Sequence, residues 1–151
     1  MAAIDLQTLK KLRNETSASI ADCRRALDET NGDYKKALEW LKKRASEIAA
    51  KKADRETGEG LIEAYIHGGG KVGVLVELLC ETDFVAKTDE FKNLAKEVAL
   101  QVAAMNPADV DSLLKQEYIR DSSQTIEQYV KAVIGKLGEN ITIKRFARFE
   151  L

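Results

Sequence analysis

Three side chains that could support nucleophilic chemistry occur in the middle of the chain: His67, Cys80 and Asp83. A cysteine nucleophile needs a histidine as its base and a further group that orients the histidine. The spacing of these residues does not by itself place them in that geometry. A small cysteine-dependent hydrolase is therefore one hypothesis, and the alternative is a polar strand end and a buried cysteine.

A run of three glycines and a lysine, Gly68–Lys71, raises a second hypothesis, a phosphate-binding loop. The phosphate-loop motif requires a glycine where this chain has Tyr65, and a serine or threonine where it has Val72. Because both positions disagree, we interpret the glycine run as the tip of a β-hairpin.

Metal, cofactor and disulfide chemistry are not indicated. No group of histidines, cysteines and carboxylates has the spacing of a metal site. Cys23 and Cys80 are the only 2 cysteines, and they lie far apart without CxxC spacing. We expect both to be reduced, buried thiols, and we expect no cofactor.

The composition is that of a globular protein, with 44% apolar and 32% charged residues. A net charge of -1 gives no general affinity for nucleic acid. The N-terminus has no basic region followed by an apolar run, and no stretch is apolar over the roughly 20 residues of a membrane span. We therefore expect a cytoplasmic protein without membrane contact.

The segment Glu81–Ala86 differs from these candidates because it combines polar caps with an aromatic residue. Thr82 or Asp83 can accept backbone hydrogen bonds at the start of a helical turn. The local pattern favours Phe84 packed inward as a core anchor.

The elements that must position this segment follow from periodicity. The first 45 residues predict three short helices: Leu6, Leu9 and Leu12 form the stripe of the first, and Ile20, Cys23, Ala26 and Leu27 that of the second. Asp33 caps the third after the helix-ending pair Asn31-Gly32. Residues 42–59 predict an exposed helical connector, whose interleaved charges favour a solvated face over an RNA-binding patch.

Beyond Gly60 the pattern becomes that of an α+β domain. Two β-rich runs, Leu61–His67 and Val72–Cys80, flank the glycine tip and predict a hairpin with a central second strand. Thr88 begins an amphipathic helix that Pro107 ends, and a second helix spans Thr125–Leu137. A closing strand starts at Ile141, with Ile143, Ala147, Phe149 and Leu151 on one face and a break at Arg145-Phe146.

Several ordered segments together resemble the bacterial elongation factor Ts family. Thr82-Asp83-Phe84-Val85-Ala86 is similar to the TDFVA motif of that family, and it stands between a strand and an amphipathic helix as expected. Further similar segments are Leu9–Arg25, Ala49–Ala53 and Gly138–Ile141. The matches run in order across nearly the whole chain, so the chain is identified as a member of this family.

The resemblance implies a fold and a function. It implies a three-helix domain of the ubiquitin-associated type at 1–45, a linker at 46–60, and an α+β core of the dimerisation type at 61–151, with a three-stranded antiparallel sheet packed with helices. It also implies a non-enzymatic guanine nucleotide exchange factor that acts on elongation factor Tu without a cofactor. A binding module of the ubiquitin-associated type fused to an unrelated α+β domain remains the other non-enzymatic alternative.

The family's functional positions carry over to particular residues. The Asp-Phe pair that wedges near the magnesium and phosphate site of the GTPase corresponds to Asp83 and Phe84, flanked by Thr82 and Val85. The family's arginine on the first helix corresponds to Arg13. At the second helix, Ile20 and Ala21 stand where the family commonly has two methionines, so only part of that apolar contact is preserved.

The chain is shorter than many family members, which have a second core half and a helical insertion. Only residues 108–140 separate Pro107 from the closing strand. A three-stranded sheet with helices on one side leaves the other face to be covered. We therefore expect a homodimer with Ile141, Ile143, Phe149 and Leu151 near its interface, the alternative being a monomer whose own helices bury this strand.

Overall fold

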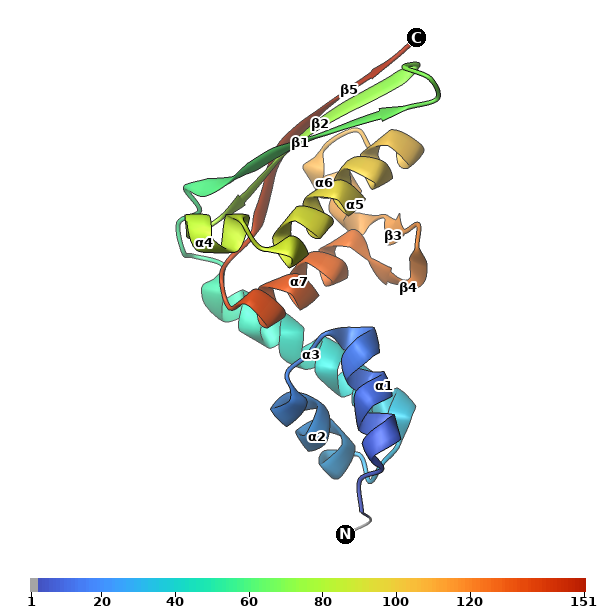
Figure 1. Ribbon diagram of the computed structural model, residues 1–151, viewed down its shortest axis with the longest axis vertical. Helices are drawn as coiled ribbons and strands as arrows, with labels where there is room; N and C mark the ends of the chain where they lie inside the picture. Colours follow the sequence, from blue (N-terminus) through green and yellow to red (C-terminus); the bar gives the residue numbers. More distant parts are fainter. Residues whose placement is uncertain (1–2) are drawn as a thin grey trace.

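The computed structural model describes residues 3–151 as an elongated molecule with helices at the N-terminal end and a sheet at the other (Figure 1). The N-terminal helices are α1 (Leu6–Thr16), α2 (Ile20–Glu29) and α3 (Tyr34–Lys52). Each begins at a capping side chain, Asp5, Ser19 and Asp33 respectively, which accepts hydrogen bonds from backbone N–H groups of the first turn. The three predicted helices are therefore confirmed.

The apolar stripes of the first two helices are only partly buried. Leu12, Cys23, Ala26 and Leu27 lie in a small core with Ala37 and Leu41, but Leu6 and Ile20 are exposed. Residues three apart on a helix are about 60° out of line, so a stripe spaced in threes turns away from the buried side. Leu6 and Ile20 therefore lie at the exposed ends of these stripes.

Helix α3 joins the two ends of the molecule without a break. Its first half packs on α1 and α2, and its second half packs on α7, where Ala49 is buried in the main core. The expectation of an exposed connector from residue 42 was therefore wrong for this part of the chain. The predicted boundary between residues 45 and 46 falls inside α3.

The sheet has three antiparallel strands in the order β1-β2-β5: β1 (Glu59–His67), β2 (Val72–Cys80) and β5 (Thr142–Glu150). β1 and β2 pair along their whole length, from Glu59 opposite Cys80 to His67 opposite Val72. The predicted hairpin and the central position of its second strand are confirmed.

The helices α4 (Asp83–Ala86), α5 (Asp89–Met105), α6 (Val110–Lys115) and α7 (Ile126–Leu137) all lie on one side of the sheet (Figure 1). Thr88 caps α5, and α7 begins with a capping box at Thr125 and ends at Gly138 in the left-handed conformation. The main core lies between β2, α5 and α7. It is built around the fully buried side chains Val76, Leu78, Phe91, Leu94, Val98, Val102, Leu113 and Ile126.

A bulge in β5 changes which of its side chains face the helices. Glu77 pairs with Arg145 but Leu78 pairs with Ile143, so Lys144 has no partner on β2. Ile143 is consequently buried in the core, whereas Phe149 is exposed on the opposite face. The expectation that Ile143 and Phe149 share one face was wrong, because one extra residue reverses the alternation.

A short hairpin follows α6, formed by β3 (Glu117–Tyr118) and β4 (Asp121–Thr125). The buried side chain of Gln101 on α5 holds it. Gln101 Nε2 donates to the Glu117 carbonyl at 3.0 Å, and the Ile119 N–H donates to Gln101 Oε1 at 3.0 Å. Periodicity did not indicate this hairpin, because its strands are short and polar.

Candidate functional site

The segment Thr82–Val85 leads from the central strand into the single turn α4. The Thr82 hydroxyl accepts a hydrogen bond from the Val85 N–H at 3.4 Å and so caps the turn. Asp83 is exposed and pairs with Lys87 at 3.0 Å. Thr82 and Val85 are half-buried, so Asp83 and Phe84 are the two members of the segment that project into solvent.

Phe84 is 81% exposed and lies outside the hydrophobic core. The interpretation of Phe84 as a core anchor is therefore wrong. Ala86 takes the inward position instead, where its methyl group is buried against the core. A large aromatic side chain in this position is available to a partner surface, because the fold makes little use of its apolar area.

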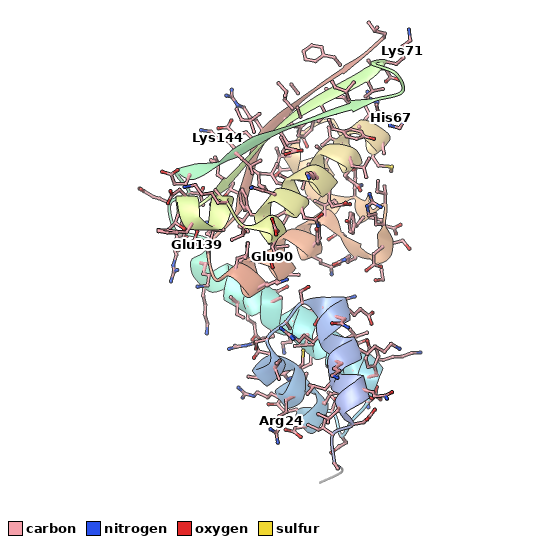
Figure 2. The ribbon with its side chains drawn as sticks, viewed as in Figure 1. Arg24, His67, Lys71, Glu90, Glu139 and Lys144 are labelled. Atoms are coloured by element: carbon pink, nitrogen blue, oxygen red, sulfur yellow. The ribbon has the colours of Figure 1, made fainter. Side chains whose placement is uncertain are left out.

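The turn before α4 is held by Glu139, which follows α7. Its Oε1 accepts hydrogen bonds from the backbone N–H groups of Thr82 at 2.9 Å and Glu81 at 3.2 Å. Its Oε2 accepts from the Thr82 hydroxyl at 2.7 Å. Figure 2 shows Glu139 beside α4, at the end of the sheet remote from the hairpin tip.

In a second set of hydrogen bonds, the donor is Asn140, the residue after Glu139. The Asn140 N–H donates to Glu81 Oε1 at 2.8 Å, and Asn140 Nδ2 donates to the Arg55 carbonyl at 2.9 Å. Arg55 in turn places its guanidinium 3.6 Å from Glu81 Oε1. Sequence reasoning treated Gly138–Ile141 only as a point of resemblance. Contacts between residues almost sixty positions apart leave no local periodicity that would have revealed this role.

The other predicted site residues lie in a separate part of the molecule. Arg13 near the end of α1 and Ala21 in α2 are exposed, and Ile20 at the start of α2 is 54% exposed. These three residues border the α1–α2 turn, whereas α4 lies against the sheet (Figure 1). The structure therefore places the predicted site residues on two separate surfaces and does not bring them all together.

The geometry excludes the hypothesis that His67, Cys80 and Asp83 form a catalytic group. Cys80 and His67 lie at opposite ends of the β1–β2 pair. For strands of this length, the two ends are about 25 Å apart. Figure 2 shows His67 near the hairpin tip. Cys80 donates to the Thr82 carbonyl at 3.1 Å. Burial, together with the nearby Glu139 carboxylate, raises the pKa of Cys80 to about 11, which disfavours the nucleophilic thiolate.

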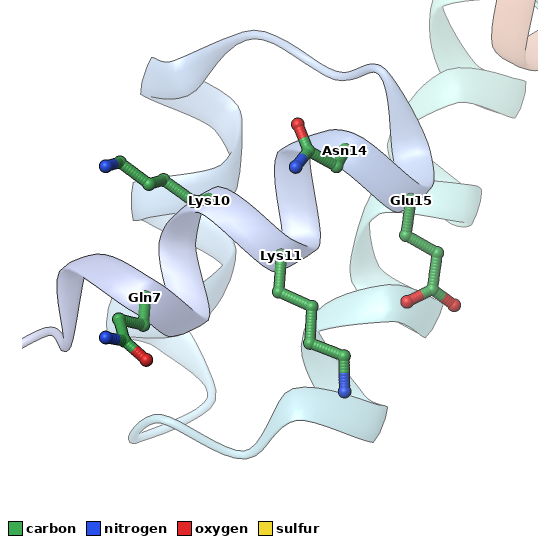
Figure 3. A pocket seen from close by; sticks show the side chains of 5 residues that line it. All are labelled: Gln7, Lys10, Lys11, Asn14 and Glu15. Atoms are coloured by element: carbon green, nitrogen blue, oxygen red, sulfur yellow. The ribbon is translucent and has the colours of Figure 1, made fainter.

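The glycine run forms the tip of a hairpin, as the sequence predicts. Residues 68–71 form the loop between β1 and β2, so the glycine run joins two strands, not a strand and a helix as in a phosphate loop. A hollow lined by Gln7, Lys10, Lys11, Asn14 and Glu15 lies along α1 alone (Figure 3). Residues 3–151 contain no group of three histidines, cysteines or carboxylates placed to hold a metal ion.

Comparison of the sequence with known proteins shows the family to which the chain belongs. The model of the family described as elongation factor TS matches residues 81–151, which include α4 and Glu139. A relative named elongation factor Ts from Caldanaerobacter subterraneus subsp. tengcongensis is 42% identical, with 97% of this chain and 96% of the relative covered. The chain belongs to the elongation factor Ts family. Its members are translation elongation factors.

Two further relatives show how length varies among similar proteins. The protein named elongation factor Ts, chloroplastic, from Guillardia theta is 45% identical, with 98% of this chain and 89% of the relative covered. Elongation factor Ts of Nostoc sp. is 47% identical over the whole of this chain but only 48% of the relative. The Caldanaerobacter alignment spans 192 positions, so that relative has residues with no counterpart here. Within residues 3–151, no helix is both long enough and apolar enough to cross a membrane.

Proposed function

We propose that the chain is a guanine nucleotide exchange factor for elongation factor Tu. The observation that carries this proposal is the exposed Asp83-Phe84 pair on a single helical turn, held at its base by Glu139. Family membership supplies the partner. The chain acts in the cytoplasm by binding the GTPase and needs no cofactor, because exchange breaks no covalent bond.

Exchange follows from differential binding. A factor that binds the nucleotide-free GTPase more tightly than the GDP-bound form weakens GDP binding by the same ratio. Burial of Phe84 in a pocket of the partner provides about 1.5 to 3 kcal/mol. Each 1.4 kcal/mol of differential binding corresponds to about tenfold in GDP affinity, so the phenylalanine alone accounts for one to two decades.

The charge of Asp83 supplies a second contribution near the magnesium and phosphate site of the GTPase. A carboxylate brought close to a bound diphosphate repels it and competes for the metal ion that neutralises it. Asp83 is suited to this role because it is exposed and its cationic neighbour, Lys87, is itself on the surface. Thr82 supports this pair by capping α4, and Val85 contributes to the edge of the contact with the GTPase.

The N-terminal helices provide a second contact with the GTPase. We assign residues 1–45 to a domain of the ubiquitin-associated type, residues 46–60 to a linker and residues 61–151 to the core domain. Arg13, Ile20 and Ala21 form the contact surface of the N-terminal domain. The exposure of Ile20 supports this role, because this apolar side chain at the first position of α2 leaves 54% of its surface open to solvent.

The decisive experiment is release of a fluorescent GDP from elongation factor Tu, measured by stopped flow with and without the chain. We expect the release rate to rise with the concentration of the chain and to reach a plateau. Binding of the chain to elongation factor Tu without faster release would instead favour the simple binding module and refute exchange.

We also propose that two copies associate through the outer face of the sheet. This face exposes Ile62, Ile66, Leu75 and Phe149, and no helix in residues 3–151 covers it (Figure 1). Ile66 and Phe149 both pair with Gly73, which places them on either side of a residue without a side chain. Ile141 and Ile143 were expected at this interface, but they are buried in the chain's own core.

Light scattering at micromolar concentration tests the association. We expect the mass of a dimer, because an apolar patch spread over three strands is stabilised by exclusion of water. Phe149→Lys places a charge in the apolar patch of each copy and is expected to give a monomer, whereas Lys144→Ala at the exposed bulge is expected to remain dimeric. A monomeric mass for the unmodified chain would refute the dimer and leave the exchange proposal unaffected.

A further inference from the structure

Helix α4 is too short to determine its own orientation. It consists of the single turn Asp83–Ala86, and one helical turn is unfavourable by itself because it orders several residues for one hydrogen bond. Asp83 and Phe84 are both exposed, so packing does not hold them in place. The direction in which they project depends on the groups that hold Thr82, the residue that precedes them.

The carboxylate of Glu139 is the main group that holds Thr82. It accepts two hydrogen bonds from Thr82, from the backbone N–H at 2.9 Å and from the hydroxyl at 2.7 Å. Hydrogen bonds to an ionised acceptor are about twice as strong as neutral ones. Glu139 and Thr82 are both half-buried, which protects these bonds from competition with water.

The Thr82 hydroxyl connects this carboxylate to the cap of α4. A hydroxyl has one hydrogen to donate and two lone pairs that accept. Donation of that hydrogen to Glu139 turns the lone pairs toward the Val85 N–H, which lies 3.4 Å away. Glu139 therefore orients the cap that begins the turn, as well as the backbone that leads into it.

The position of Glu139 is itself determined by the core. It follows Gly138, which ends α7 in the left-handed conformation, and it precedes Asn140, which is buried and donates to Glu81 and Arg55. Three segments remote in sequence, the end of α3, the turn before α4 and the turn after α7, thus meet at one place. A rigid support of this kind reduces the entropy lost when the pair enters a partner pocket.

We propose that Glu139 is a positioning residue for nucleotide exchange: it holds the Thr82 turn so that Asp83 and Phe84 project in the orientation that the partner GTPase accepts. The consequence for exchange rests on the proposed function. The holding of the turn can be measured in the free chain.

The first measurement is amide hydrogen exchange in the free chain, with Glu139→Ala as the test variant. We expect the Thr82 and Val85 amides to exchange at least about tenfold faster, because their acceptor or its orientation is lost, while the amides between β1 and β2 stay protected. Glu127→Ala is the matched control. Glu127 is an exposed carboxylate on α7 that pairs with Lys131 at 3.4 Å, and its removal is expected to leave both sites unchanged.

The second measurement is the stimulated release of GDP from elongation factor Tu. For Glu139→Ala we expect the plateau rate to fall about tenfold, with a smaller change in the half-saturating concentration because the N-terminal surface still binds. Glu139→Gln retains an oxygen that accepts from the backbone N–H groups and is expected to recover most of the rate. A role of Glu139 in folding alone would not change the plateau rate of chain that remains folded.

Several outcomes would overturn the proposal. One is unchanged amide exchange at Thr82 in Glu139→Ala, and another is faster exchange there with an unchanged plateau rate. If the amides throughout β2 lose their protection in Glu139→Ala, that variant is unfolded and Thr82→Val is used in its place. Thr82→Val removes the hydroxyl while keeping the shape of the side chain, and full exchange activity of this variant would also overturn the proposal. If the unmodified chain fails to accelerate GDP release, both the proposed function and the role of Glu139 in nucleotide exchange are refuted. Amide hydrogen exchange then tests only whether Glu139 holds the turn.

Discussion

Replacement of Phe84 by alanine separates partner binding from folding. Because the side chain is 81% exposed and lies outside the core, its removal is expected to change the free energy of unfolding by no more than about 0.5 kcal/mol. The same change removes the apolar area proposed to enter the GTPase, which is worth about 1.5 to 3 kcal/mol. Stimulated GDP release is therefore expected to fall by about ten- to a hundredfold.

The assay is stopped-flow release of fluorescent GDP over a range of concentrations of the chain, beside urea unfolding of each variant. Phe84→Leu is expected to retain more stimulation than Phe84→Ala, since it keeps much of the apolar area. Ile119→Ala is the matched control, because Ile119 is an exposed apolar residue in the turn between β3 and β4. Stimulation by Phe84→Ala equal to that of the unmodified chain would refute the reasoning, provided that its urea midpoint is also unchanged.

Three further predictions concern stability and ligand binding. Gln101→Leu removes the buried amide that bonds the Ile119 N–H and the Glu117 carbonyl. Because these two hydrogen bonds are partly buried, urea unfolding is expected to show a loss of about 1 to 3 kcal/mol; a loss below about 0.5 kcal/mol would contradict the role of Gln101. The pKa of Cys80 is raised by burial to about 11 from an ordinary value of 9.0; the folded state thus holds this proton more tightly, and stability is expected to fall as pH rises from 9.0 toward 11. The slope of the urea midpoint over that range should be smaller in Cys80→Ala, and equal slopes would exclude Cys80 as its source. Calorimetry should detect no binding of GDP or GTP to the free chain, because its glycine run forms a hairpin tip, and micromolar affinity would contradict that interpretation.

Most of the secondary structure could be predicted because its signals are local. The cap at Thr88 precedes an apolar face repeated along α5, and Thr125 and Gly138 mark the two ends of α7. The hairpin follows from two β-rich runs on either side of three glycines. The β3–β4 hairpin could not be predicted in this way, since its position depends on Gln101 in a different helix.

The candidate site could be predicted only in part. Its central pair, Asp83 and Phe84, was identified by resemblance to a family motif, whereas local reasoning placed Phe84 inside the core. Whether an aromatic side chain after a strand faces inward or outward depends on which neighbour fills the core position, and here Ala86 does so. Glu139 escaped notice as a site residue because its partners are 57 and 58 positions away.

By itself, the sequence determined the types and ends of most helices and strands, since capping, periodicity and turn residues act within a few positions. Tertiary structure decided the features that depend on remote contacts. The unpaired Lys144 in β5 sends Ile143 and Phe149 to opposite faces of the sheet. Packing on α7 makes the second half of α3 part of the core. The hydrogen bonds of Glu139 hold the turn from which Phe84 projects, and such bonds form only once both segments have folded against the same sheet.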